Sequence, residues 1–113
     1  MKKLNLLLHV PESVRFEAAL KQGRNFALAM ADKPYEIIIL VNFEGVTVLE
    51  KFATFEELFK EVIAKGAKVY FCENALKAFN IAFEKVPKDA YTVPAGIVAL
   101  VEWQEEGFRY VRP

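Results

Sequence analysis

Residues 35–43 read Tyr-Glu-Ile-Ile-Ile-Leu-Val-Asn-Phe, and Ile37 to Val41 form an unbroken apolar run. The run is rich in β-branched side chains and is apolar on both faces. This pattern is typical of a strand buried in a parallel sheet. Pro34 precedes the run and Gly45 follows it, and both are residue types that favour turns. A strand covered on both faces requires helices on both sides of its sheet.

Short apolar runs and longer amphipathic stretches alternate on either side of this strand. The amphipathic spacing predicts helices and the short runs predict strands. The predicted strands are residues 4–10, 35–43, 67–71, 91–93 and 108–111. The predicted helices run from Ser13 to about Ala31, between Thr54 and Gly66, from Glu73 to about Ala82, and from Gly96 to Gln104. Residues 46–49 either extend the second strand or start a short helix.

Local signals predict where the helices begin and end. Ser13 is a predicted N-cap. Thr54, with Glu57 three residues later, matches a capping box, and Gly66 is a predicted C-terminal stop.

Five strands alternating with helices predict a single three-layer α/β domain over residues 1–113, with a mostly parallel sheet and helices on both faces. We expect the flavodoxin-like strand order 2-1-3-4-5, which makes the first and third strands neighbours. Ligands bind at the carboxyl ends of strands where the order reverses. His9 and Cys72 lie at the ends of those two strands, so the only histidine and the only cysteine are predicted to converge.

Cys72 is the main candidate for chemistry because it stands at a strand-to-helix junction. The first turn of a helix has unpaired N–H groups and a positive dipole end, and both stabilise the reactive thiolate. The alternative is a small buried residue that only packs. His9 is either a base or orienter for the thiolate, or an imidazole bonded to backbone.

Other candidates are weaker. Asn25, Asn42 and Asn74 are weak candidates for the third member of a Cys–His pair, and Asn42 and Asn74 are also candidate ligand contacts. The helix start Pro94-Ala95-Gly96 either binds an anion through its N–H groups or is an ordinary tight turn. The five glycines are too scattered for a nucleotide loop, so we expect no cofactor. One histidine and one cysteine without zinc spacing predict no metal site.

Composition excludes several classes of protein. Lys and Arg together number 15, as do Asp and Glu, so no basic excess favours nucleic-acid binding. A neutral chain that is 54% hydrophobic permits self-association. A single cysteine favours a reducing, cytoplasmic location. Residues 1–8 imitate a signal peptide, but polar residues interrupt the stretch too early, and no run is long enough to span a membrane.

Three segments resemble the DsrE/DsrF-like family. Residues 69–76, Val-Tyr-Phe-Cys-Glu-Asn-Ala-Leu, are similar to the cysteine segment of that family. Residues 93–98, Val-Pro-Ala-Gly-Ile-Val, and 104–113, Gln-Glu-Glu-Gly-Phe-Arg-Tyr-Val-Arg-Pro, resemble two further family segments. His9 at the end of the first strand and Arg24-Asn25 in the first helix also fit.

The resemblance implies a small α/β domain that forms homo-oligomers, typically trimers or hexamers. It also implies sulfur trafficking, in which Cys72 accepts a sulfane sulfur as a persulfide from a donor protein and passes it to an acceptor. No second cysteine is present to resolve the persulfide within the chain. The alternative is a non-catalytic, homo-oligomeric ligand-binding or assembly module with a structural Cys72.

Overall fold

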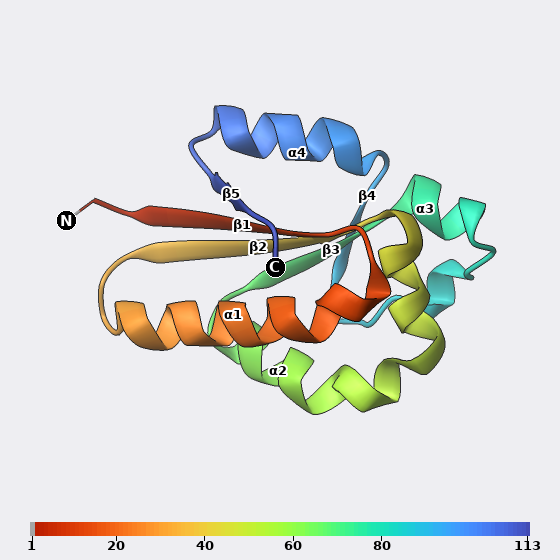
Figure 1. Cartoon of the computed structure of the whole chain (residues 1–113), viewed down its shortest axis with the longest axis horizontal. Coiled ribbons are helices and arrows are strands. Elements are labelled where there is room, and N and C mark those ends of the chain that lie inside the picture. Colours follow the sequence, from red (N-terminus) through yellow and green to blue (C-terminus); the bar gives the residue numbers. More distant parts are fainter. Residues whose placement is uncertain (1) are drawn as a thin grey trace.

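The computed structural model describes residues 2–113 and shows one five-stranded sheet between layers of helices (Figure 1). The strands are β1 (Leu4–Val10), β2 (Tyr35–Val41), β3 (Lys68–Cys72), β4 (Tyr91–Val93) and β5 (Arg109–Val111). The α-helices are α1 (Phe16–Met30), α2 (Glu56–Ala64), α3 (Glu73–Ala78) and α4 (Gly96–Glu105). The 3-10 segments are η1 (Ser13–Arg15), η2 (Phe43–Phe55) and η3 (Phe83–Lys85).

The strand order is β4-β3-β2-β1-β5, and every pairing is parallel. The predicted class, with a parallel sheet and helices on both faces, is confirmed, but the predicted order 2-1-3-4-5 is wrong. Strands β1 to β4 lie side by side in chain order. Only the last connection crosses back, and it places β5 beside β1. As a result, β2 separates β1 from β3.

The direction of each connection explains which helix covers which face. A crossover between parallel strands is almost always right-handed. The connections from β1 to β2 and from β2 to β3 step in one direction, and they place α1 and α2 on the same face. The connection from β4 to β5 steps in the opposite direction, so α4 lies on the other face (Figure 1).

The apolar run in β2 is buried on both sides of the sheet. Ile37, Ile39 and Val41 belong to the larger core under α1 and α2, whereas Ile38 and Leu40 pack in a smaller core under α4. Alternation of side chains along a strand produces this division. The unbroken run is therefore explained by two covering layers.

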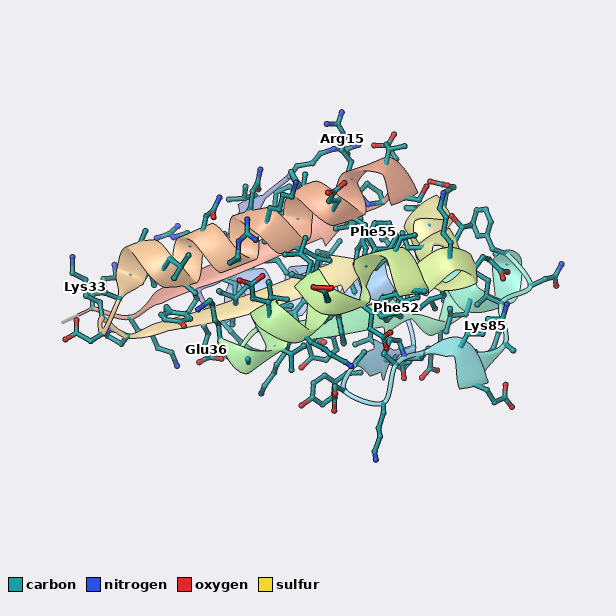
Figure 2. All side chains as sticks on the ribbon, turned by 90° about the horizontal axis from the view of Figure 1, so that it is seen from below. Arg15, Lys33, Glu36, Phe52, Phe55 and Lys85 are labelled. Atoms are coloured by element: carbon teal, nitrogen blue, oxygen red, sulfur yellow. The ribbon has the colours of Figure 1, made fainter. Side chains whose placement is uncertain are left out.

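Aromatic side chains fill the layer between the sheet and its larger helical cover. Phe16 meets Phe55 edge-on with ring centroids 5.1 Å apart, and Phe52 meets Phe59 at the same separation. Figure 2, which looks onto α1 and α2, shows Phe52 and Phe55 within this layer and charged side chains such as Arg15 and Lys85 at its margin. These contacts hold η2 against α1 and α2.

Some predicted helix boundaries are wrong because the predicted capping side chains bond to other partners. The Ser13 hydroxyl donates to Glu44 Oε2 (2.7 Å) rather than capping a helix. The Thr54 hydroxyl donates to the Lys51 carbonyl (2.9 Å), so α2 begins without the predicted capping box. Gly66, with a φ of 95°, ends α2 as predicted. Residues 46–49 are helical, and α3 ends at Ala78 rather than near Ala82.

Candidate functional site

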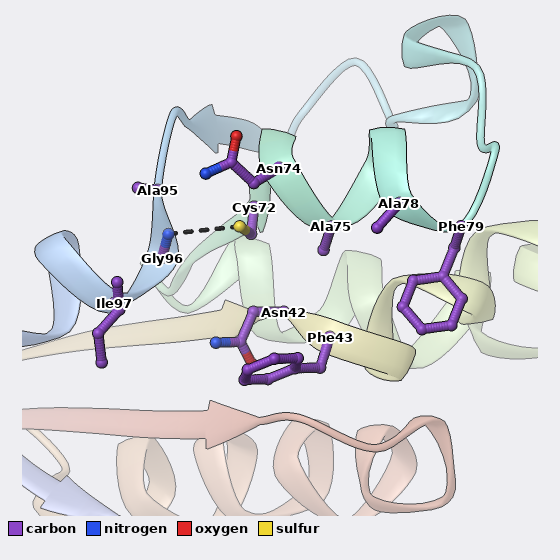
Figure 3. A pocket seen from close by; sticks show the side chains of 10 residues that line it. All are labelled: Asn42, Phe43, Cys72, Asn74, Ala75, Ala78, Phe79, Ala95, Gly96 and Ile97. Carbon is purple, nitrogen blue, oxygen red and sulfur yellow. Dashed lines mark hydrogen bonds between the residues drawn. The ribbon is translucent and has the colours of Figure 1, made fainter.

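Cys72 is the last residue of β3 and the N-cap of α3. Its side chain is buried, with 6% of its surface exposed. The Gly96 backbone N–H donates a hydrogen bond to Cys72 Sγ over 3.3 Å, as Figure 3 shows. The sulfur therefore faces a donor and lies out of bulk solvent.

The donor that reaches the sulfur comes from α4 and not from α3. Gly96 is the first residue of α4, which has ten residues, and its N–H is one of those that a helix leaves without an internal partner. The Asn74 N–H, in the first turn of α3, instead donates to the Pro94 carbonyl (3.3 Å). The N–H and the helix dipole of α4 stabilise negative charge on sulfur. The helix start predicted to bind an anion thus meets the predicted nucleophile.

A pocket of about 470 Å³ opens at the carboxyl ends of β2, β3 and β4. Its lining residues are Asn42, Phe43, Cys72, Asn74, Ala75, Ala78, Phe79, Ala95, Gly96 and Ile97 (Figure 3). None of them carries a charge. Carboxyl ends of parallel strands are where ligands bind in such sheets, so the site lies at the predicted edge although the strand order differs.

Asn42 is the link between the pocket and the neighbouring strand β1. It follows β2 directly and is the one buried polar residue among those described, with 5% of its surface exposed. Its Oδ1 accepts a hydrogen bond from His9 Nε2 (2.9 Å), and its backbone N–H donates to the Val10 carbonyl (3.1 Å). Its amide nitrogen is directed toward Gly96 (Figure 3).

His9 lies outside the pocket lining. The Tyr110 hydroxyl donates to His9 Nδ1 over 2.6 Å, and His9 Nε2 is bonded to Asn42. Burial holds the pKa of His9 below its usual 6.5; the Asn42 hydrogen bond opposes this shift, and the charge of Arg112 adds to it. Both ring nitrogens of the neutral imidazole are engaged. Because β2 lies between β1 and β3, His9 reaches the pocket only through Asn42, and the predicted direct convergence with Cys72 is wrong.

The pocket contains most of the remaining predicted site residues. Asn42, Asn74, Ala95 and Gly96 line it, whereas Pro94 contributes only its carbonyl, as the acceptor for the Asn74 N–H. Sequence reasoning missed the apolar part of the lining, which consists of Phe43, Ala75, Ala78, Phe79 and Ile97. Phe43 and Ile97 directly follow predicted site residues. Their position shortly after the ends of strands could have identified them as lining residues.

The backbone at Phe43 is unusual. Phe43 has a φ of 48°, in the left-handed region that bulky residues rarely adopt, and 67% of its surface is exposed. Strained residues tend to occur at binding sites, where the surrounding structure holds them in place. Here the strain places an aromatic ring at the pocket beside Asn42.

Two negative findings apply to residues 2–113. No group of three or more His, Cys, Asp or Glu side chains is placed to hold a metal ion. In the same range, none of the helices has the length and apolar character needed to cross a membrane.

A family model for the DsrE/DsrF-like family matches residues 6–113. The chain belongs to this family. The match spans β1 to β5 and includes His9, Asn42, Cys72 and Gly96. Family membership is consistent with a role in sulfur relay.

The chain shares its fold with proteins whose structures have been solved. A protein of unknown function from Methanobacterium thermoautotrophicum is 23% identical, with a TM-score of 0.80 over 100% of both chains. A conserved protein of unknown function from Bacteroides thetaiotaomicron is 17% identical, with a TM-score of 0.68, and the match covers 98% of this chain and 94% of that one. No curated protein matches the chain. At these identities the likeness establishes the fold alone.

Proposed function

We propose that the protein is a sulfur carrier of the sulfurtransferase type, which accepts a sulfane sulfur on Cys72 as a persulfide and passes it to a partner thiol. The observation that carries the proposal is the hydrogen bond from the Gly96 N–H at the start of α4 to Cys72 Sγ, inside a pocket. A thiolate is the attacking species in sulfur exchange. This donor is placed to hydrogen-bond the attacking sulfur, and the pocket leaves room for the added sulfur.

The proposed reaction is a sulfur exchange that needs no external oxidant or reductant. The Cys72 thiolate attacks the outer sulfur of a donor persulfide, R–S–SH. A new S–S bond forms on Cys72 while the donor S–S bond breaks. The bonding electron pair leaves with R–S⁻, which then takes up a proton from solvent. Passing the sulfur on to an acceptor thiolate repeats the same exchange from the other side.

His9 acts in this proposal as an orienter and not as a base. Its two ring nitrogens already bond to Tyr110 and Asn42. Removal of a proton from Cys72 therefore relies on solvent, and the donor at Gly96 stabilises the resulting charge.

The absence of a second cysteine requires a donor and an acceptor outside the chain, since no intramolecular disulfide can release the sulfur. Such a carrier must keep its thiol reduced, which favours a cytoplasmic location.

The test is persulfide loading measured by intact mass. Reduced protein incubated with polysulfide should gain the mass of one sulfur atom, about 32 Da, and dithiothreitol should remove it. Cys72→Ser keeps a polar atom facing Gly96 and should gain nothing. A wild-type protein that gains no mass, while its thiol still reacts with a neutral alkylating agent, would contradict the proposal.

The second candidate function is a non-catalytic module that binds a small ligand. The burial of Cys72 and the uncharged pocket lining favour it. Ligand binding that is unaffected by Cys72→Ser, together with no persulfide loading, would support this alternative.

We also propose that the protein forms a homo-oligomer, a trimer or hexamer, through the outer face of α4. Ile97, Val98 and Val101 are exposed on this helix, and contiguous exposed apolar surface often marks an interface. Light scattering on a sizing column should give a multiple of the chain mass. Val98→Glu with Val101→Glu should lower that mass, whereas Leu28→Glu, at an exposed site on α1, should leave it unchanged. A wild-type monomer would contradict the proposal.

A further inference from the structure

Asn42 has an amide nitrogen that no protein group accounts for. Its side chain is buried, yet among residues 2–113 its only side-chain hydrogen bond is the one that Oδ1 accepts from His9. Figure 3 shows the amide nitrogen directed into the pocket, toward Gly96 and Ile97. Buried polar groups normally find a partner. Asn42 Nδ2 itself is accessible from the pocket, since among residues 2–113 only Asn5 Oδ1 is a fully buried side-chain polar atom without a partner. It is therefore an unpaired donor that a ligand in the pocket can reach.

Tyr110 and His9 fix which end of the Asn42 amide faces the pocket. An amide oxygen only accepts hydrogen bonds, so His9 Nε2 must carry the proton that it donates to Asn42 Oδ1. His9 Nδ1 is then an acceptor, and the Tyr110 hydroxyl donates to it. This tautomer also agrees with the neutral ring that burial favours. With this tautomer, a half-turn of the amide would set two donors against each other at His9, so Nδ2 faces the pocket as long as His9 Nε2 carries the proton.

Gly96 allows the donor and the sulfur to approach the same stretch of backbone. A Cβ on Gly96 would lie 3.4 Å from Asn42 Nδ2 and 3.3 Å from Leu40 Cδ2. The Gly96 N–H is also the donor to Cys72 Sγ. Asn42 Nδ2 and the Cys72 sulfur thus flank one glycine.

The other lining residues indicate what kind of ligand the pocket can hold. Phe43, Phe79 and Ile97 supply apolar surface, and none of the ten lining residues is charged. A ligand that carried several charges would lose hydration without gaining an ionic partner.

We propose that the pocket binds a ligand with an uncharged, apolar body and a hydrogen-bond acceptor at its reactive end, that Asn42 Nδ2 donates to this acceptor, and that Tyr110 and His9 are positioning residues for the donor. The inference rests on the proposed function, because it names the class of sulfur donor for the same Cys72 thiol. That class is a persulfide with an uncharged alkyl or aryl body, whose sulfur is the acceptor.

The first experiment measures which reagents reach Cys72. Benzyl methanethiosulfonate is neutral, while the sulfonatoethyl and trimethylammonioethyl reagents are negative and positive. In each case the Cys72 thiolate attacks the sulfur bonded to the organic group, a disulfide forms, and methanesulfinate leaves with the bonding electron pair. Rates are divided by those of the urea-unfolded chain, which removes intrinsic differences between reagents.

We expect the normalised rate of the benzyl reagent to exceed that of both charged reagents by about tenfold or more, as loss of hydration without an ionic partner requires. Equal normalised rates for all three reagents would overturn the proposed ligand class.

The second experiment tests the positioning residues. The chain has a single histidine, so imidazole ¹⁵N spectra report His9 alone. We expect the Nε2–H tautomer in the wild type and a mixture in Tyr110→Phe. The benzyl reagent should react several-fold more slowly with Tyr110→Phe and about tenfold more slowly with Asn42→Asp, which still accepts from His9 but has no donor. Tyr91→Phe alters a tyrosine outside the pocket and should match the wild type.

A wild-type Nδ1–H tautomer would overturn the chain of hydrogen bonds. Unchanged benzyl rates in both Asn42→Asp and Tyr110→Phe would overturn the role of the donor. Thermal unfolding of each variant separates these effects from loss of structure, and Tyr110→Phe keeps the ring that packs against His9.

The two proposals fail in different ways. Polysulfide loading without a preference for the neutral reagent leaves the sulfur carrier intact and removes this inference. A clear preference for the neutral reagent, with no persulfide loading from either polysulfide or a benzyl persulfide, keeps the binding site and removes the sulfur carrier.

Discussion

Gly45 holds the ends of β1 and β2 together next to the site. Its N–H donates to the carbonyls of Pro11 (3.1 Å) and Asn42 (2.9 Å). A Cβ at this position would lie 2.3 Å from the Val10 carbonyl oxygen. The shortest contact of such a Cβ is to backbone, which cannot move away as a flexible side chain can, and the Val41 side chain follows at 3.1 Å. A side chain at position 45 therefore does not fit, and glycine is the residue that this position near Asn42 requires.

Gly45→Ala should lower the free energy of unfolding by about 2 kcal/mol or more, because the backbone of β1 must shift. Gly23→Ala is the matched control. Its Cβ would meet side chains at ordinary distances, beginning with Ile39 Cδ1 at 3.7 Å, and alanine in a helix should raise stability by about 0.5–1 kcal/mol. Urea unfolding of both variants measures the difference. A Gly45→Ala variant as stable as the wild type would show that the strand ends are not tightly held.

At the scale of elements, the connection from β2 to η2 contains a strained residue next to a glutamate clamp, a set of hydrogen bonds that Glu44 accepts. Phe43 takes the strained conformation. Glu44 accepts hydrogen bonds from the N–H and hydroxyl of Ser13, both at 2.7 Å, and from the Thr47 hydroxyl. These hydrogen bonds hold the pKa of Glu44 below its usual 4.5. The clamp ties the start of η2 to η1 and so maintains the position of Phe43.

Phe43→Asn should raise the free energy of unfolding by up to about 1 kcal/mol, because asparagine tolerates positive φ. The same variant should react more slowly with the benzyl reagent, because the pocket loses an aromatic ring. Phe79→Asn is the control: Phe79 has an ordinary negative φ of −103° and should gain no stability. Equal losses of stability in both variants would mean that the strain at Phe43 is negligible.

At the scale of the whole molecule, the crossing of α4 assembles the site. Helix α4 begins at Gly96, whose N–H donates to Cys72, and the chain then continues into β5, which brings Tyr110 to His9. The segment from α4 to β5 therefore contacts the Cys72 thiol at its start and His9 near its end.

The half-buried His9 should make folding sensitive to mild acid. Because the pKa of His9 is lowered in the folded state, the unfolded chain binds more protons between that value and 6.5. Stability should be complete above pH 6.5 and fall as the pH drops through the folded pKa. Tyr110 and Asn42 contact the ring and Arg112 adds repulsion, so each influences the midpoint.

Thermal unfolding across this range measures the effect. The Tm of the wild type should fall as the pH drops below 6.5, and the Tm of His9→Gln should change less. Glu44 also destabilises the fold in acid, but only below pH 4.5. Parallel Tm curves for wild type and His9→Gln above pH 4.5 would contradict this assignment.

Local pattern was enough to predict five strands, four helices and the parallel α/β class, because burial on two faces is visible within residues 37–41. It also placed Cys72 at the end of its strand and Gly96 at the start of a helix. Only the tertiary structure decided the strand order, the helix that donates to the sulfur, and the contacts of His9. Strand order depends on which connection crosses back, and apolar strands of similar composition do not encode their neighbours. The contact between His9 and Tyr110 joins residues 101 positions apart, and no periodicity reaches that far.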